Sequence, residues 1–170
     1  DYPIIANTIC NHKNINHIIV PHEINSKSIN TLKKYLNINT IKYSEITKLK
    51  SVSTNILIVD VFGILKNLYQ YSTITYIGGG FNKGVHNTIE PAIYGNLILF
   101  GPKYKKFPET FAFIQKGIAC SVQNRAEFEE KLNIYLQTNT NKQENINIIN
   151  QYITKNQQNI EDIINVMKSK

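Results

Sequence analysis

The residues best suited to bind a ligand lie in one segment of the chain, residues 78–92. Gly78, Gly79 and Gly80 directly follow an apolar run, and glycines permit backbone conformations that let a ligand approach the main chain closely. A helix is predicted to begin near Asn87, a good N-cap residue, so that its free amides and positive dipole end face the glycines. The segment therefore predicts a binding site for an anion such as a phosphate or a carboxylate.

Glu90 lies in the first turn of this predicted helix, next to the expected anion. A carboxylate in that position can accept two hydrogen bonds from the diol of a ribose. The same carboxylate could instead complement the helix dipole or form a capping box with Asn87. The spacing of the residues leaves both interpretations open, one functional and the other structural.

Two common phosphate-binding motifs are excluded by the residues of this segment. The dinucleotide fingerprint requires a glycine where Lys83 stands, and a P-loop requires a lysine after Gly84, where Val85 stands. The loop therefore supports neither NAD binding nor ATP hydrolysis. Cys10 and Cys120 lack the spacing of a metal site or a disulfide framework, so both are interpreted as free thiols.

Two further short segments lie where a ligand could reach them. Pro21 and His22 follow a predicted strand, and His22 could contact a phosphate or a base, or be an ordinary loop histidine. Phe62 and Gly63 open a predicted helix, where backbone amides again point toward the edge of the sheet. No pairing of a nucleophile with a base stands out anywhere in the sequence.

Short apolar runs alternate regularly with helical patterns along the chain. Strands are predicted near residues 17–21, 41–43, 56–60, 74–77, 97–100 and 118–122, and helices near 1–11, 29–36, 63–71, 87–94, 108–116 and 124–136. This alternation predicts an α/β domain with a doubly wound parallel sheet of about five or six strands. Ligands bind such sheets beyond the carboxyl ends of the strands, which places the site after Val20, Val59, Ile77 and Phe100.

A length of 170 residues fits a single domain, whose core is predicted at about residues 15–136. Closing helices are predicted at about 141–168, because helical spacing is kept by Ile160, Ile163, Ile164 and Met167. A domain of this kind normally opens with a strand, whereas residues 1–11 favour a helix. We therefore expect a first strand and an amino-terminal domain outside this chain.

The net charge of +7 and the pI near 9.3 favour anionic partners, namely nucleotide phosphates, nucleic acid or an anionic membrane surface. An RNA-binding module needs basic residues interleaved with aromatic ones, and the sequence has one such patch, Tyr104 with Lys103, Lys105 and Lys106. Nucleic-acid binding is therefore not expected. No apolar run is long enough to predict a membrane-spanning helix.

The sequence resembles the Kdo transferases of lipopolysaccharide synthesis, which move 3-deoxy-D-manno-octulosonic acid (Kdo) from CMP-Kdo to a lipid A precursor. The shared features around the glycines are the block Gly84-Val85-His86-Asn87-Thr88-Ile89-Glu90-Pro91-Ala92 and the turn Gly101-Pro102. Two earlier segments match in the same order, Val20-Pro21-His22-Glu23-Ile24 and Asp60-Val61-Phe62-Gly63-Ile64. The resemblance covers about residues 15–122.

The resemblance implies the carboxy-terminal, nucleotide-binding half of a two-domain GT-B glycosyltransferase with a Rossmann-like fold. It assigns the nucleotide contacts to Pro21, His22, Phe62, Gly63, Ile64, Gly78, Gly79, Gly80, His86, Asn87, Thr88, Ile89 and Glu90. It implies inverting transfer that needs no metal and no other cofactor. It also places the catalytic base in the amino-terminal domain, so that this chain holds no catalytic residue and is inactive alone.

The sequence departs from the family pattern at two positions. Many members have arginine where His22 stands, so this chain lacks a permanent positive charge for the phosphate at that position. Many also have glutamate where Ile64 stands, so the second loop is expected to act through its backbone. The expected partners are CMP-Kdo, a lipid A precursor bound by the other domain, and anionic lipid at the cytoplasmic face of the bacterial inner membrane. The alternative is another GT-B transferase, or an epimerase, that uses a UDP- or GDP-sugar.

Overall fold

The computed structural model describes residues 1–48, 51, 53–139 and 141–168. In chain order its elements are α1 (Tyr2–Asn11), β1 (His17–Ile19), α2 (Ser26–Leu36), β2 (Ile41–Lys42), the 3-10 helix η1 (Tyr43–Lys48), β3 (Ile56–Ile58), α3 (Leu65–Leu68), the 3-10 helix η2 (Tyr69–Tyr71), β4 (Ile74–Ile77), α4 (Ile89–Ala92), β5 (Leu97–Phe100), α5 (Pro108–Gln115), β6 (Ala119–Ser121), α6 (Arg125–Gln137) and α7 (Lys142–Lys168). The predicted alternation of strands and helices is confirmed, and each predicted strand is present at its expected place.

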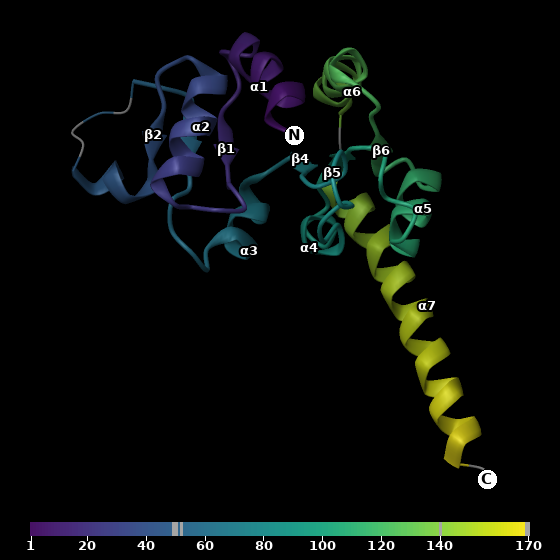
Figure 1. The fold of residues 1–170 in the computed structure, drawn as a ribbon. Coiled ribbons are helices and arrows are strands. Elements are labelled where there is room, and N and C mark those ends of the chain that lie inside the picture. The colour runs from purple at the N-terminus through teal and green to yellow at the C-terminus, as the bar shows by residue number, and fades with distance from the viewer. Residues whose placement is uncertain (49–50, 52, 140, 169–170) are drawn as a thin grey trace.

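The described strands are all parallel and form two three-stranded sheets, in the orders β1-β3-β2 and β4-β5-β6. Ile19 of β1 lies beside Ile58 of β3, and Ile77 of β4 lies beside Phe100 of β5. The predicted α/β class is therefore confirmed. The continuous sheet that we expected is divided in two, because no described strand joins β1 to β4 (Figure 1).

Helix α1 connects the two sheets by covering one face of both. Ala6 and Ile9 belong to a hydrophobic cluster with Ile19 of β1, whereas Ile5 also packs against a second cluster that contains Phe128 of α6. Figure 1 shows α1 between α2 and α6, and α1 contacts both helices. The apolar stripe of a single helix thus fixes one half of the domain against the other.

The opposite face of the second sheet packs on α5 and α7. Phe100, Phe113 and Ile149 are fully buried in this core. The ring of Tyr152 meets that of Phe113 edge-on, with 5.4 Å between the ring centroids. Both faces of the second sheet are therefore covered, as expected for a parallel sheet.

The predicted closing segment is one continuous helix, α7. Its first turns pack on the second sheet, and the helix then continues away from the body of the domain (Figure 1). The predicted apolar seam cannot be followed to its end, because the described part of the structure does not include the side chains of Ile160, Ile163 and Ile164. Of the helices that the structure describes, none has the length and apolar character needed to cross a membrane.

Helix boundaries agree with the sequence where a side chain caps the helix. At α6, Asn124 Oδ1 accepts a hydrogen bond from the Glu127 amide at 3.0 Å, and Glu127 Oε2 accepts one from the Gln123 amide at 2.9 Å. The sequence alone predicts this cap, because a glutamate three residues after an asparagine is typical of a helix start. The helix predicted at 63–71 is wrong at its start, because Gly63 has a φ of +87°, outside the helical region, so α3 begins only at Leu65.

The fold makes one prediction about the pH dependence of stability. Burial lowers the pKa of His17, which begins β1, below its ordinary value of 6.5. The unfolded chain therefore binds a proton at this residue more readily than the folded chain, so the free energy of unfolding should decrease as the pH falls below about 6.5. Urea unfolding at pH 5 and pH 7.5 should show a smaller pH effect in His17→Gln, and equal effects in both proteins would contradict the prediction.

Candidate functional site: the cleft between the two sheets

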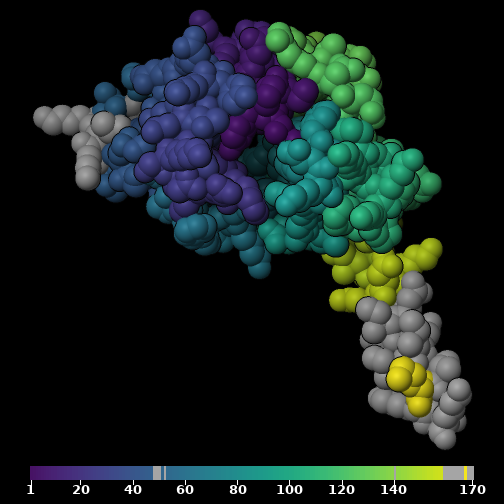
Figure 2. Space-filling view, viewed as in Figure 1, coloured from purple at the N-terminus to yellow at the C-terminus, as the bar shows by residue number. Residues whose placement is uncertain are grey.

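A cleft of about 1,610 Å³ separates the two sheets. Residues 15–24, which include β1, line one side, and residues 71–79, which include β4, line the other. Figure 2 shows the hollow between the purple and blue amino-terminal half and the teal half of the molecule. The carboxyl ends of β1, β3 and β4 all open into this cleft, where ligands bind in folds of this class.

Most of the predicted binding residues meet in this cleft. The predicted residues that do line the cleft are Pro21, His22, Phe62, Gly63, Gly78, Gly79, His86, Asn87 and Glu90. They come from three loops that are far apart in the sequence, and the fold brings these loops to one end of the sheets. The predicted residues that do not line the cleft are Ile64, Gly80, Thr88 and Ile89.

The glycine loop folds back on itself after β4. The Gly84 amide donates a hydrogen bond to the Gly79 carbonyl at 3.1 Å, and the His86 amide donates one to the Gly78 carbonyl, also at 3.1 Å. Gly79 has a φ of +91°, and a Cβ atom there would lie 2.3 Å from the Gly84 carbonyl oxygen. Glycine is therefore required at position 79, and the closed loop holds His86 against the end of β4.

Gly80 serves the packing of the loop and does not face the cleft. A Cβ atom at Gly80 would lie 2.5 Å from the backbone nitrogen of Gly101, which follows β5. Lys103 donates its backbone N–H to the Gly80 carbonyl at 2.9 Å, and this bond ties the two loops together. Glycines at positions 80 and 101 thus allow the two main chains to approach each other closely.

The amide of Gly79 already has an anionic partner in this structure. Oδ2 of Asp1 accepts a hydrogen bond from Gly79 N at 2.8 Å and another from the Tyr76 hydroxyl at 3.1 Å. Burial raises the pKa of Tyr76, which keeps that hydroxyl a donor. The predicted anion site at the glycines is therefore occupied by the first residue of the chain, and nothing in the sequence pattern indicated this role for Asp1.

The start of α4 differs from the prediction. The helix is four residues long, Ile89–Ala92, and Asn87 Oδ1 accepts hydrogen bonds from the amides of Ile89 at 2.9 Å and Glu90 at 3.3 Å. Free amides at this helix start were therefore wrongly predicted for these two residues, because the Asn87 side chain satisfies them. The helix is short because Gly95, with a φ of +73°, turns the chain out of it.

Glu90 takes part in this cap and also faces the cleft. Its Oε1 accepts a hydrogen bond from Asn87 Nδ2 at 3.0 Å, so the structural alternative from the sequence is present. Within the described residues no group donates to its second oxygen, Oε2, and Glu90 lines the cleft. The two interpretations are therefore compatible, since one oxygen holds the cap while the other is available to a ligand.

The remaining residues of this segment point elsewhere. Thr88 is completely buried, and its hydroxyl lies 3.5 Å from Glu109 Oε1 of α5, so its side chain supports the core. Ile89 is half exposed outside the cleft. Ile64, in the separate loop between β3 and α3, accepts hydrogen bonds at its carbonyl from the amides of Asn67 and Leu68 and so holds the first turn of α3. Successive residues of a turn face different directions, which is why one block contributes to both core and cleft.

Two histidines approach each other from opposite sides of the cleft. The rings of His22, after β1, and His86, after the glycine loop, have centroids 5.2 Å apart and planes tilted by 51°. Both side chains are exposed to solvent. Two imidazoles at this separation can bind an anionic group jointly, and each can donate a hydrogen bond to a phosphate oxygen.

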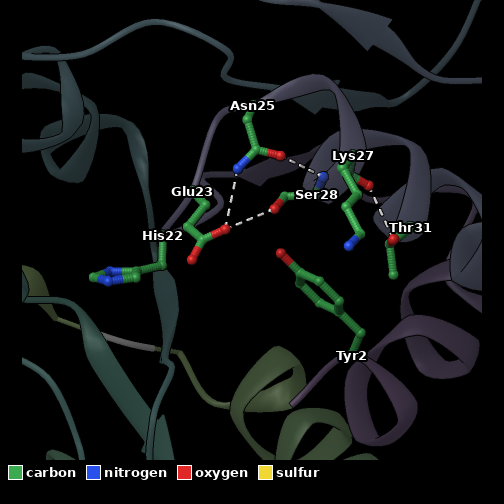
Figure 3. Close-up of a pocket in the computed structure, with 7 residues that line it drawn as sticks. All are labelled: Tyr2, His22, Glu23, Asn25, Lys27, Ser28 and Thr31. Carbon is green, nitrogen blue, oxygen red and sulfur yellow. Dashed lines mark hydrogen bonds between the residues drawn. The ribbon is translucent and has the colours of Figure 1, made fainter.

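A smaller pocket of about 370 Å³ lies beside the cleft, at the start of α2 (Figure 3). Glu23 accepts hydrogen bonds there from Ser28 Oγ at 3.0 Å and Asn25 Nδ2 at 3.1 Å, and these bonds lower the pKa of its carboxyl group. Asn25 in turn caps α2 through the Ser28 amide. In Figure 3 the ring of His22 points away from this network. The pocket is therefore a helix-capping arrangement, and His22 belongs to the large cleft.

Two cleft residues had not been predicted as binding residues. Lys83, in the glycine loop, is the one lysine among the described residues that line the cleft, and its ammonium group suits a phosphate. Tyr69 of η2 also lines it, and burial together with the charge of Glu90 raises the pKa of Tyr69 to about 12. Lys83 could have been selected from the sequence, because it lies within the glycine loop. Tyr69 could not, because only the fold brings η2 to α4.

The chemistry of the cleft is that of binding an anion and a diol. In the part of the chain that the structure describes, no group of three or more His, Cys, Asp or Glu side chains is placed to hold a metal ion. Asp60, which follows β3, is engaged by Ser44, whose amide and hydroxyl donate to its two carboxylate oxygens at 2.9 and 2.6 Å. The site thus offers histidines, a lysine and one free carboxylate oxygen.

Comparison with known proteins relates the chain to one group of enzymes. It is 35% identical over 130 residues to a bifunctional glycosyltransferase/methyltransferase of Fusobacterium nucleatum, a match that covers 74% of this chain and 20% of that protein. It is 32% identical over 126 residues to a 3-deoxy-D-manno-octulosonic acid transferase of Rickettsia felis, covering 73% of this chain and 27% of that protein. No family model matches the sequence.

The fold has a counterpart among solved structures. The C-terminal CMP-Kdo binding domain of WaaA from Acinetobacter baumannii matches with a TM-score of 0.74, at 19% sequence identity, over 89% of this chain and 82% of that domain. The chain spans about a quarter of the length of the relatives that it matches in sequence. The chain is therefore a relative of the 3-deoxy-D-manno-octulosonic acid transferases, and it has the fold of the C-terminal domain of these GT-B glycosyltransferases.

Proposed function

We propose that this chain is the donor-binding part of a glycosyltransferase that transfers Kdo from CMP-Kdo to a lipid A precursor. The main observation in support of the proposal is that His22, His86 and Glu90 all line one cleft, at the carboxyl ends of the strands. Its support from other proteins is the sequence relationship to Kdo transferases. The rest of the enzyme would bind the acceptor and supply the catalytic base.

The cleft residues suggest how CMP-Kdo would lie. Glu90 Oε2 would accept hydrogen bonds from the ribose diol, and the phosphate would lie between His22, His86 and Lys83. Phe62 is 80% exposed at the end of β3, where its ring is free to stack on the cytosine base. The Asp1 carboxylate at Gly79 would repel a phosphate, so the phosphate should lie toward the histidines rather than at the glycine amides.

These roles define the contribution of the chain to catalysis. The acceptor hydroxyl would attack the anomeric carbon of Kdo while the bond from that carbon to the CMP phosphate breaks, which inverts the configuration. Negative charge then develops on the leaving phosphate, and His22, His86 and Lys83 would stabilise it in place. In this proposal the protein's own cations neutralise the phosphate, and the reaction uses no metal and no cofactor.

The acceptor also suggests where the enzyme would work. A lipid A precursor is held in a membrane, so we place the protein at the cytoplasmic face of the bacterial inner membrane. A net charge of +7 would favour contact with anionic lipid at that surface. Co-sedimentation with vesicles of increasing anionic lipid content tests this part, and binding that does not depend on lipid charge would contradict it.

The donor assignment is tested by titrating the protein with CMP, UMP and UDP while observing assigned backbone amides by NMR. Shifts confined to CMP, at residues 78–90 and at His22, would support the proposal. A preference for UDP at the same residues would retain the site and assign the substrate to a UDP-sugar. If none of the three nucleotides caused shifts in the whole protein that carries this chain, the proposal would be wrong.

The residue at position 22 makes a second prediction. His22→Arg should bind CMP about fivefold to tenfold more tightly, because a guanidinium is always charged and can donate two parallel hydrogen bonds to a phosphate. Calorimetric titration with CMP and with cytidine, which lacks the phosphate, measures the effect. A gain that was equal for cytidine would show that residue 22 does not contact the phosphate.

A further inference from the structure

The start of α7 is hydrogen-bonded to the end of a short helix that borders the cleft. Lys142, the first residue of α7, donates hydrogen bonds from its ammonium group to the carbonyls of Gln70 and Ser72. Both carbonyls lie at the end of η2, where a helix leaves carbonyl groups without partners of its own. A lysine side chain can satisfy such carbonyls, so Lys142 caps η2 from a distant part of the chain.

The position of Lys142 is itself well determined. Asn141 Oδ1 accepts hydrogen bonds from the amides of Gln143 at 3.1 Å and Glu144 at 3.4 Å, and so caps the first turn of α7. Burial lowers the pKa of Lys142, because the ammonium group is partly removed from water. Its hydrogen bonds to η2 therefore offset a cost of desolvation that a lysine in open solvent would not have.

The same part of α7 also holds the end of α4, and α7 begins beside α4 (Figure 1). Asn145 Nδ2 donates a hydrogen bond to the carbonyl of Gly95, the residue that turns the chain out of α4, at 3.0 Å. A Cβ atom at Gly95 would lie 2.4 Å from the Lys142 carbonyl oxygen. The two main chains are therefore in direct contact, and a side chain at position 95 would separate them.

A buried asparagine completes the connection between these elements. Asn96 is only 1% exposed, and its Nδ2 donates to the Tyr69 carbonyl and to Thr75 Oγ1, both at 3.0 Å. Tyr69 begins η2 and Thr75 belongs to β4, so this side chain ties the start of η2 to the second sheet. Hydrogen bonds in such a buried network are strong because water does not compete for them.

The two helices held in this way carry two residues of the cleft. Tyr69 of η2 and Glu90 of α4 both line it, and the charge of Glu90 contributes to the raised pKa of Tyr69. Helix η2 has three residues and α4 has four. Helices this short are not stable by themselves, so their positions depend on the contacts that other elements make with them.

We propose that Lys142 and Asn145 are positioning residues of the donor site. By holding η2 and α4 to the start of α7, they fix Glu90 Oε2 where the ribose diol would bind. The inference rests on the proposed function, in which Glu90 accepts hydrogen bonds from the ribose. Neither Lys142 nor Asn145 lines the cleft, so both act through the two short helices and not by contact with the nucleotide.

Hydrogen exchange tests the inference without any nucleotide, in the protein that carries this chain. Lys142→Met removes the ammonium group, and exchange at the Ser72 amide, which closes η2, should become about tenfold faster. Asn145→Ala removes the bond to Gly95, and exchange at the Ile93 amide, which closes α4, should become faster by a similar factor. Unchanged exchange at both amides would overturn the inference.

A lysine outside this network provides the matched control. Lys131 of α6 donates to the neighbouring Glu130 at 2.9 Å, so Lys131→Met also removes an ammonium group that is hydrogen-bonded. This variant should change neither CMP affinity nor exchange at Ser72 and Ile93. The Phe128 amide, which bonds to the Asn124 carbonyl in α6, should exchange at the parent's rate in each variant and so shows that the domain remains folded.

CMP binding tests the role of the two residues in the site. The double variant Lys142→Met/Asn145→Ala should bind CMP about threefold to tenfold more weakly than the parent protein. It should bind 2′,3′-dideoxycytidine monophosphate as tightly as the parent, because that nucleotide lacks the diol. In a protein that already carries Glu90→Ala, the same two substitutions should cause no further loss of CMP affinity, since their effect passes through Glu90.

A merely structural role predicts different results. Equal losses for CMP and the dideoxy nucleotide, or a full further loss in the Glu90→Ala protein, would show general loosening and would overturn the inference. If Glu90→Ala weakened CMP binding and the double variant did not, the inference would fail while the donor assignment stood. If the parent protein bound no CMP, the donor assignment would fail and the inference with it, so CMP binding by the parent distinguishes the two failures.

Discussion

Replacement of Glu90 by alanine is expected to weaken CMP binding about tenfold to a hundredfold. A hydrogen bond to a charged group contributes about 1.5–3 kcal/mol, which corresponds to that range of affinity. The free oxygen of Glu90 faces the cleft, and in our proposal it is the acceptor for the ribose diol. Calorimetric titration with CMP measures the loss, and 2′,3′-dideoxycytidine monophosphate, which lacks the diol, should bind the variant and the parent protein equally.

The chain offers a matched control for this experiment. Glu127 caps α6 with Asn124 much as Glu90 caps α4 with Asn87, but it does not line the cleft. Glu127→Ala should therefore lower stability by a similar amount and leave CMP affinity unchanged. If Glu90→Ala and Glu127→Ala had the same effect on CMP binding, the role of Glu90 would be confined to the cap.

Gly80→Ala should lower the free energy of unfolding by about 3 kcal/mol. The added Cβ atom would lie 2.5 Å from the Gly101 nitrogen and 2.7 Å from its Cα atom, and neither backbone can move without opening the contact between the loops after β4 and β5. Urea unfolding monitored by circular dichroism measures the loss.

Gly117→Ala provides the comparison for Gly80→Ala. Gly117 has a φ of +74°, but nothing lies within 4 Å of the Cβ position. Its substitution should therefore show only the strain of the left-handed backbone, about 1 kcal/mol. If both substitutions destabilised the protein equally, the close approach of Gly80 and Gly101 would not be important for stability.

Together these experiments separate the two functions of the segment 78–92. Gly79 and Gly80 shape the loop, Thr88 anchors it to the core, and His86 and Glu90 face the cleft. Among these residues, a loss of CMP binding in a protein that remains folded is expected only for substitutions of His86 and Glu90. Separate measurements of CMP affinity and stability would therefore show which residues of the segment contact the nucleotide.

The sequence by itself determined the secondary structure and the general place of the site. Apolar runs and helical spacing predicted the order of strands and helices, because alternate burial and helical periodicity are properties of local sequence. The capping pair of Asn124 and Glu127 was readable for the same reason, since both residues belong to one turn. The family resemblance placed the nucleotide-binding loops, and nine of the residues it named do line the cleft.

Only the tertiary structure decided how these parts meet. Two contacts of the site join residues that are far apart in the chain: Asp1 with Gly79, and the ring of His22 with that of His86. The division of the strands into two sheets also depends on residues that are far apart. The side of α4 that faces the cleft was likewise undetermined, and the structure buries Thr88 while leaving Glu90 accessible. Contacts between distant segments depend on how whole elements pack, and a local pattern of residue types carries no information about that packing.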